Sequence, residues 1–264
     1  MRKKTVKKKI TKKKPEKRLL LRLNKRAGRA RSGSITVRHK GGGVKRLYRV
    51  IDFGQNKIDI PAKVIALEYD PYRTSFIVLL EYLDGERRYR IAPEDLRVGD
   101  EVINAPQTEI KIGNRMKLKN IPVGMDVYNI EIISGKGGIM IRSAGNRAEV
   151  LAQEGKYTHL KMPSGEIRKV FRECYASIGM VSNVEHRYKK LGKAGISRLK
   201  GRRPSVRGTA MAPVSHPHGG GEGKAPIGMP YPKTPWGKIA RGGKTRKRKY
   251  TDKYIIKSRR KKKK

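Results

Sequence analysis

The sequence is poor in acidic residues, cysteine and aromatic side chains. Only 22 of its 264 residues are Asp or Glu, against 66 Lys and Arg, so the formal net charge is +44. A chain with this charge repels itself and resists compaction unless a polyanion neutralises it. The shortage of acids therefore indicates a polyanionic partner. Nucleic acid fits best, because each phosphate contact releases counterions and so drives binding.

Two further absences narrow the class of protein. Cys174 is the single cysteine, so no internal disulfide can form, which fits a reducing compartment. No apolar run approaches the length of a transmembrane helix, and we find no amphipathic helix or lipid signal, so an anionic membrane is a poor alternative partner. The first residues lack the apolar segment of a secretory signal, and their lysine-rich composition, with Glu16 as the first acid, makes a transit peptide the lesser alternative.

Charge divides the chain into three parts. Residues 1–43 hold 18 basic residues and one acid, residues 44–191 hold 25 and 19, and residues 192–264 hold 23 and two. The middle part has the composition of a globular domain. The two ends carry too much charge and too few large apolar residues to bury a core by themselves. We expect them to be basic extensions that become ordered against phosphate.

The middle part has the periodicity of β-strands. The expected strands of its first half span residues 47–53, 61–70, 75–92 and 99–105. Within them, Asp84–Gly85 is a strong signal for a hairpin turn. Short strands at this spacing, separated by Gly and Pro, favour a small closed or sandwiched β domain, which we place at residues 44–121.

A second β unit is expected at residues 122–191, after a hinge at Ile121–Pro122. Its strands are expected within 120–133, 135–146, 147–162 and 167–176. Gly155 and Gly165 mark its hairpin corners. The best helix candidate is short, at 183–192, with Gly192 as its terminator. The chain is thus expected to be mainly β, with two small domains in tandem between basic extensions at 1–43 and 192–264.

A series of motifs identifies a family. They include 38-RHKGGG-43, 84-DGERRY-89, 135-GKGG-138, 202-RRPSVRGTAM-211 and 216-HPHGGGEG-223. The motifs occur in this order and spacing from about Gly33 to Lys257. On this basis the chain resembles the bacterial-type L-two family of large-subunit ribosomal proteins. The resemblance implies an OB-fold barrel followed by an SH3-like barrel, with both termini threaded into ribosomal RNA.

The resemblance also implies a function and partners. It implies a structural constituent of the large ribosomal subunit, a primary rRNA-binding protein that supports subunit association, tRNA placement and the peptidyl-transferase region. Its partners would be large-subunit rRNA and other large-subunit proteins, with the small subunit and tRNA reached through the assembled ribosome. We expect no membrane partner, no homo-oligomer, no cofactor and a cytoplasmic rather than organellar ribosome. The alternative is an architectural RNA-binding protein outside the ribosome.

Three hypotheses compete for the histidine loop 216-HPHGGGEG-223. A metal site would use His216, His218 and Glu222, but Pro217 and the glycines leave its geometry unset. General-base catalysis needs a group that orients the histidine, and this chain has Ser215 where many relatives carry a carboxylate, as well as Ala212 earlier in the loop. Packing against RNA needs only close backbone approach and imidazole contacts, and we favour it. We therefore expect no enzyme and no metal, with His216 and His218 supporting the peptidyl-transferase region as the resemblance implies.

The remaining candidate RNA contacts are basic and glycine-flanked. In 202–207, guanidinium forks in an extended segment can clamp phosphates. The glycines at 41–43 favour close approach of the backbone to phosphate, whereas 135-GKGG-138 lacks the Walker spacing and indicates a tight turn. Trp236 either stacks on a base or covers the protein surface. The predicted RNA-binding residues are Arg38, His39, Lys40, Lys45, Arg46, Arg87, Arg88, Lys136, Arg142, Lys193, Arg202, Arg203, Arg207, His216, His218, Lys224, Trp236, Lys244, Arg246, Lys247 and Arg248.

Overall fold

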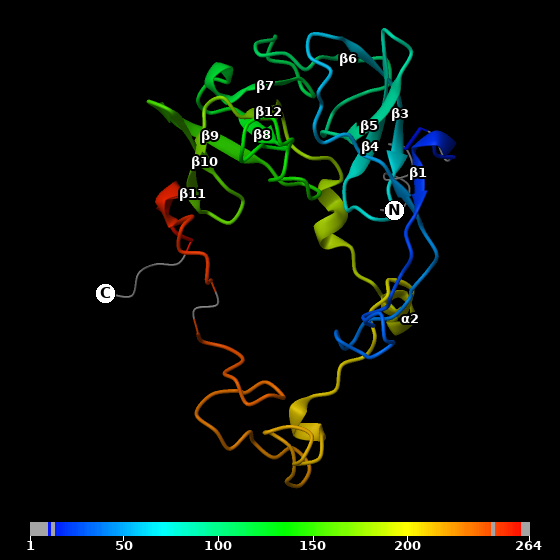
Figure 1. Ribbon diagram of the computed structural model, residues 1–264, viewed down its shortest axis with the longest axis vertical. Coiled ribbons are helices and arrows are strands. Elements are labelled where there is room, and N and C mark those ends of the chain that lie inside the picture. Colours follow the sequence, from blue (N-terminus) through cyan, green and yellow to red (C-terminus); the bar gives the residue numbers. More distant parts are fainter. Residues whose placement is uncertain (1–9, 12–13, 244–245, 260–264) are drawn as a thin grey trace. The chain divides into compact units, whose positions relative to one another are not determined.

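The chain divides into two compact units. The computed structural model describes residues 10–11, 14–243 and 246–259. Unit 1 comprises Met1–Asn24, Arg46–Lys190 and Thr251–Lys264, and unit 2 comprises Lys25–Lys45 and Leu191–Tyr250 (Figure 1). Within the described residues, unit 1 contains all of the strands, and unit 2 contains the α-helix α2 (Ala194–Leu199). No helix among the described residues is long and apolar enough to cross a membrane.

The first sheet of unit 1 has four antiparallel strands in the order β5-β4-β3-β6. Their bounds are β3 (Ala62–Tyr69), β4 (Phe76–Tyr82), β5 (Arg87–Ile91) and β6 (Glu101–Val102). The hairpin predicted at Asp84–Gly85 is confirmed, since it joins β4 to β5 and Gly85 has a positive φ of 76°. Five consecutive residues of β4 are buried because neighbouring strands flank it and side chains cover both of its faces.

The second sheet has seven strands in the order β13-β11-β10-β9-β8-β12-β7. Their bounds are β7 (Arg115–Lys117), β8 (Asp126–Tyr128), β9 (Ala148–Glu154), β10 (Tyr157–Lys161), β11 (Ile167–Phe171), β12 (Tyr175–Ile178) and β13 (Ile255–Lys257). The predicted hairpin corners at Gly155 and Gly165 are confirmed. The strand expected at 135–146 is wrong: within it only Met140 forms a bridge, to Ile130.

Segments from the two predicted extensions contribute to the sheets of unit 1. β1 (Leu20–Arg22) pairs with β2 (Leu47–Arg49), and the Thr11 amide donates to the Leu67 carbonyl at 3.0 Å. At the other end, β13 pairs with β11. β1 and β2 form a separate two-stranded sheet, whereas β13 extends the open edge of the seven-stranded sheet, where unpaired backbone groups of β11 can accept it. The domain boundaries drawn from charge stay a prediction, and β7 already belongs to the second sheet before the hinge proposed at Ile121–Pro122.

The helical elements are short. The 3-10 turns span Lys17–Leu19, Leu118–Asn120, Val184–Tyr188, Gly208–Ala210 and Asp252–Tyr254. The helix expected at 183–192 is therefore wrong in type and extent. The 3-10 turn ends at Tyr188, and Gly192 with a positive φ of 73° separates it from α2.

Three apolar clusters form the core, and all lie in unit 1. One fills the seven-stranded sheet around Leu118, Ile130 and Leu160, and includes Cys174, which is completely buried as predicted. The other two lie on the four-stranded sheet. The two curled sheets confirm the predicted class, a mainly β protein with barrel-like domains in tandem that fit an OB-fold and an SH3-like barrel (Figure 1).

A buried ion pair lies within the second sheet. Arg115 on β7 donates to the Glu131 carboxylate at 2.9 Å, and the side chains are 1% and 2% exposed. Arg115 also donates to the Asn129 carbonyl, and the second Glu131 oxygen accepts from the amides of Gly135 and Tyr175. These extra hydrogen bonds offset the cost of removing two charges from water. No sequence motif indicated this pair.

Candidate nucleic-acid interface

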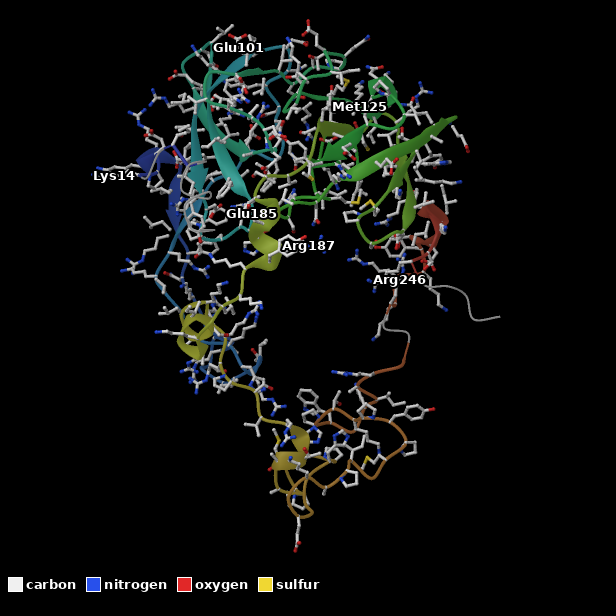
Figure 2. The ribbon with its side chains drawn as sticks, turned by 180° about the vertical axis from the view of Figure 1, so that it is seen from behind. Lys14, Glu101, Met125, Glu185, Arg187 and Arg246 are labelled. Carbon is white, nitrogen blue, oxygen red and sulfur yellow. The ribbon has the colours of Figure 1, made fainter. Side chains whose placement is uncertain are left out.

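Unit 2 is strongly cationic and has almost no core. Its two segments, 25–45 and 191–250, hold 22 Lys and Arg and a single acid, Glu222. Among their described residues, His216, at 7% exposure, is the only one that is buried. In Figure 2 the side chains of unit 1 lie densely around its sheets, whereas those of unit 2 lie along loops and short helical turns. Unit 2 therefore cannot depend on hydrophobic burial for its shape.

Backbone hydrogen bonds hold the two segments of unit 2 together. The bonds run from Gly41 N to Gly201 O (2.8 Å), from Val44 N to Leu199 O (2.9 Å) and from Arg203 N to His39 O (3.1 Å). Lys40 and Arg202 form a β-bridge. A Cβ at Gly43 would come within 2.7 Å of the Leu199 carbonyl. The structure thus gives Gly43 a role in packing of the chain on itself, and it brings together predicted RNA-binding residues that are about 160 positions apart.

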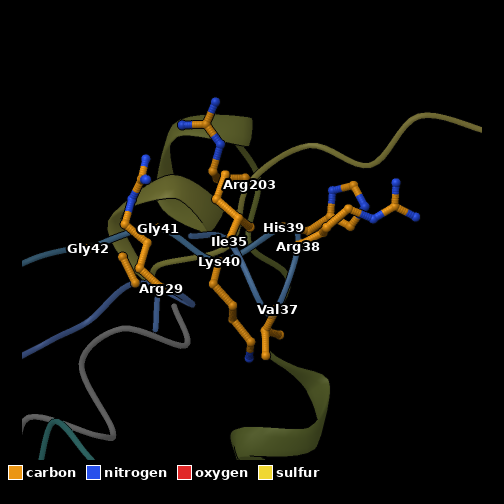
Figure 3. A pocket seen from close by; sticks show the side chains of 10 residues that line it. Arg29, Ile35, Val37, Arg38, His39, Lys40, Gly41, Gly42 and Arg203 are labelled. Carbon is orange, nitrogen blue, oxygen red and sulfur yellow. The ribbon is translucent and has the colours of Figure 1, made fainter. Parts of the chain in front are cut away.

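A pocket of about 480 Å³ opens on this paired region (Figure 3). Its apolar lining is Ala27, Ile35 and Val37, and its cationic lining is Arg29, Arg38, Lys40 and Arg203, with His39, Gly41 and Gly42 completing it. Figure 3 shows Arg29 and Arg203 on one side and Arg38 with His39 on the other. No Asp or Glu lines the pocket, so a negatively charged ligand meets no repulsion there.

Trp236 lies beside the cationic lining of this pocket. The guanidinium carbon of Arg38 is 5.7 Å from the centroid of the indole ring, which is a cation–π contact. Trp236 nevertheless remains 77% exposed. Its outer face is therefore open to a partner, and stacking on a base stays a prediction.

The histidine loop is held by its own backbone. The His218 amide donates to Nδ1 of His216 at 3.0 Å, and the Lys233 amide donates to Nε2 of His218 at 2.8 Å. The ring centroids are 4.7 Å apart. A Cβ at Gly208 would lie 2.4 Å from the His216 ring, so glycine there lets the imidazole pack directly on the backbone. The loop is thus a defined structure and not simply a glycine-rich connection.

These hydrogen bonds fix the chemistry of both imidazoles. A neutral imidazole has one lone pair, and each of these two uses it to accept a backbone N–H. Burial, and then the neighbouring His218 and Arg38, lower the pKa of His216 from its usual 6.5. Neither ring therefore has a lone pair available for a metal or for base catalysis unless a hydrogen bond breaks. Across the described residues, no three His, Cys, Asp or Glu side chains gather where they could hold a metal ion.

Arg46 and Arg142 lie at the two ends of a series of cation–π and edge-to-face aromatic contacts in unit 1. The contacts run from Arg46 to Tyr72 (4.7 Å), Tyr72 to Tyr48 (5.5 Å), Tyr48 to Arg73 (5.2 Å), Arg73 to Phe53 (5.4 Å) and Phe53 to Arg142 (3.6 Å). Of the three arginines, Arg73 pairs with a carboxylate, that of Asp70. Burial, and then the charge of Arg73, lower the pKa of Arg142. Sequence reasoning missed Arg73, which lies outside the motifs that indicated RNA contacts.

Arg87 and Arg88 on β5 form ion pairs with acidic side chains. Arg87 pairs with Glu81 at 2.9 Å, and Arg88 pairs with Glu86 at 2.7 Å and with Asp52 at 2.9 Å. The hydrogen bond from Arg88, and then that from Lys57, lower the pKa of Glu86 to about 2. Any phosphate would compete with these carboxylates for the two guanidinium groups. Their role as RNA contacts stays a prediction.

The other predicted RNA-binding residues are exposed cations. They are Lys45, Lys136, Lys193, Arg202, Arg203, Arg207, Lys224, Arg246, Lys247 and Arg248. Lys244 lies outside the described residues. Glycines beside Lys136 serve the fold, since the Gly138 amide donates to the Phe53 carbonyl at 2.9 Å and a Cβ at Gly137 would lie 2.6 Å from that oxygen. Arg29 was missed, although the turn-forming stretch 31-RSGS-34 follows it.

A β protein that holds 22 basic residues and a single acid in a unit with almost no core belongs to the class of nucleic-acid-binding proteins. Comparison with known families agrees. Residues 16–104 match the family described as Ribosomal Proteins L2, RNA binding N-terminal domain, and residues 111–237 match Ribosomal Proteins L2, C-terminal domain. The chain belongs to the ribosomal L2 family. It is an RNA-binding structural protein of the large ribosomal subunit, as the motif series predicted.

Proposed function

We propose that this protein docks on large-subunit rRNA mainly through unit 2, and that its contacts there go to phosphate rather than to base edges. The observation that carries the proposal is the charge of unit 2, with 22 basic residues and one acid in two segments whose described residues form no apolar core. Such a segment gains its remaining order from the partner that neutralises it. The parts of the basic extensions that lie outside unit 2 extend the same contact, and the series of side chains from Arg46 to Arg142 is its counterpart on unit 1.

Charge removal in the full chain tests this proposal. The test variant replaces Lys40, Arg202 and Arg203 by Ala. The matched control replaces Lys119, Arg147 and Lys161, which already pair with Glu173, Asp126 and Glu149. Each lost phosphate contact lowers the slope of log affinity against log salt by about 0.7–0.9. We expect the test variant to lose a slope of about 2–3 on large-subunit rRNA, and equal slopes for the two variants would contradict the proposal.

The finer role of the protein is proposed from the family resemblance together with the built histidine loop. In this proposal the loop supports the peptidyl-transferase region by its shape, and the protein also aids subunit association and tRNA placement in the cytoplasmic ribosome. Its neighbours there are other large-subunit proteins and, through the assembled ribosome, the small subunit and tRNA. The lone pairs already engaged at His216 and His218 favour a role in positioning over catalysis.

Two variants separate positioning from catalysis. In His216→Asn, the side-chain amide oxygen can accept a hydrogen bond from the His218 N–H, as Nδ1 of His216 does. An amide side chain cannot act as a general base. His216→Ala removes the acceptor. In reconstituted large subunits, we expect peptidyl transfer to be retained with Asn and reduced with Ala. A similar loss with both variants would contradict the positioning role and support base catalysis.

A further inference from the structure

We propose that the pocket of unit 2 binds a single unpaired nucleotide of an RNA strand, with the base on the apolar lining and the flanking phosphates on the cationic lining. The pocket is formed by residues from Ala27 to Gly42 and by Arg203. This inference rests on the proposed rRNA contact of unit 2. It goes further by naming the part of the RNA, one unpaired nucleotide, that the pocket binds.

The apolar lining is uncovered by protein. Ile35 is 61% exposed and Val37 is 50% exposed, in a unit whose only buried residue among those described is His216. Exposed branched side chains on so cationic a surface gain nothing from phosphate. A flat base that covers them removes apolar surface from water, and the neighbouring guanidinium groups offer planes on which a base can stack.

The cationic lining matches the rest of a nucleotide. Arg29, Arg38, Lys40 and Arg203 surround the apolar lining, and no acid is present. His39 is oriented by its Nδ1, which lies 2.9 Å from the Pro204 carbonyl and must therefore carry the proton. Its Nε2 is then left as an acceptor for an amino group of a base. The pocket thus offers cationic side chains to the phosphates, apolar side chains to the plane of the base and Nε2 of His39 to its edge.

The pocket is built before any ligand arrives. The Gly28 carbonyl accepts from the amides of Thr36 and Val37, both at 3.0 Å, and Arg29 forms a β-bridge with Ile35. A Cβ at Gly28 would lie 2.3 Å from the Val37 carbonyl, so only glycine allows this closure. Preorganisation reduces the entropy lost on binding.

The size of the pocket favours one extruded base. Its volume of about 480 Å³ falls within the range of small-ligand sites. Bases of an A-form duplex are stacked and paired, so their faces are covered, and their major-groove edges lie in a deep, narrow groove that side chains enter poorly. An unpaired nucleotide offers its whole base, so the pocket selects single-stranded RNA over duplex RNA.

Trp236 provides the readout, because it is the only tryptophan of the chain and contacts Arg38. The full chain is titrated with a single-stranded RNA hexamer, a duplex of the same length, uridine monophosphate and inorganic phosphate at fixed salt. We expect the hexamer to change the Trp236 fluorescence with the highest affinity. If uridine monophosphate or phosphate binds as tightly as the hexamer, the occupant is a free small molecule and the proposal is overturned.

Val37→Asp is the test variant, and Val206→Asp is its matched control. Val206 is 57% exposed, belongs to the same unit and does not line the pocket, so both variants add the same charge. A base that no longer covers an exposed Val side chain loses at least about fivefold in affinity. We expect Val37→Asp, and Ile35→Asp as a second variant, to bind the hexamer at least about fivefold more weakly than Val206→Asp, with equal duplex binding.

Equal hexamer affinities for the pocket variants and Val206→Asp would overturn the pocket while leaving the proposed function intact. That function is judged separately, by binding of the unaltered chain to large-subunit rRNA. Failure of the unaltered chain to bind this RNA would contradict the proposed function itself. In each variant, hydrogen exchange of the backbone amides of residues 36 and 37 at the wild-type rate shows that the pocket is still formed.

Discussion

The backbone N–H of His218 donates a hydrogen bond of 3.0 Å to Nδ1 of His216. His218 itself accepts from the Lys233 amide through its other ring nitrogen, Nε2. We therefore predict opposite neutral tautomers, with the proton of His216 on Nε2 and that of His218 on Nδ1. Nitrogen NMR of the imidazoles distinguishes the two forms, and identical tautomers would contradict this account of the loop.

The stability of the histidine loop should depend on pH. Burial, His218 and Arg38 hold the pKa of His216 below its usual 6.5, so the folded loop favours the neutral ring while the open loop takes up a proton more readily. The contribution of His216 is then fully present above about pH 6.5 and is lost as the pH falls below it. Proteolysis of the loop, followed at several pH values, should be fastest in acid. The His216→Asn variant should lose this pH dependence.

Gly208→Ala should displace His216. The added Cβ would lie 2.4 Å from the imidazole, which is too close for the ring to stay. The matched control is Gly195→Ala in α2, where a Cβ meets nothing within 4 Å and Ala should stabilise the helix by up to about 1 kcal/mol. NMR titration should show the pKa of His216 returning toward its usual value in Gly208→Ala alone. An unchanged titration would mean that the ring does not depend on this glycine.

Glu131→Gln should destabilise unit 1 strongly. It leaves the Arg115 guanidinium, 1% exposed, without its carboxylate, and breaking a buried ion pair costs about 3–5 kcal/mol. Glu149→Gln breaks an exposed pair with Lys161 and should cost at most about 1 kcal/mol. Urea unfolding of the full chain, followed by circular dichroism, compares the two variants. Similar midpoints for both would show that the buried pair is dispensable.

The central piece 44–191 should fold by itself, because all three apolar clusters consist mainly of its residues. A piece that spans 10–191 should be more stable, because β1 pairs with β2 and because Ile10 and Leu19 pack against the clusters. Urea midpoints of the two fragments test both statements. An unfolded 44–191 piece would make the domain assignment drawn from charge wrong.

The strands that were predicted correctly are those whose pattern is local. The hairpins at Asp84–Gly85, Gly155 and Gly165 each combine a turn residue with β-rich neighbours on both sides, so adjacent residues determine them. β13 could not be predicted in this way. Its three residues lie in a lysine-rich stretch, and β11, which lies almost 90 positions earlier, supplies the edge on which it forms.

In the candidate site, too, some features are visible in the sequence and others arise only on folding. Its cations were named from the sequence because charge and glycine are visible in any segment. The neighbours of these cations could not be named from the sequence, because folding brings together Lys40 with Arg202, Arg38 with Trp236 and Arg88 with Asp52. A charge count cannot distinguish an arginine that faces solvent from one that a carboxylate neutralises.

The sequence by itself determined the polyanionic partner, the mainly β class and the family, because net charge, alternation and ordered motifs are properties of the chain before it folds. Only the tertiary structure decided which cations share a pocket, which lone pairs of His216 and His218 are occupied, and that Arg115 and Glu131 are buried together. These depend on where side chains lie in the folded chain, and packing and hydrogen bonding set those positions for neighbours such as His216 and His218 as well as for distant residues such as Lys40 and Arg203.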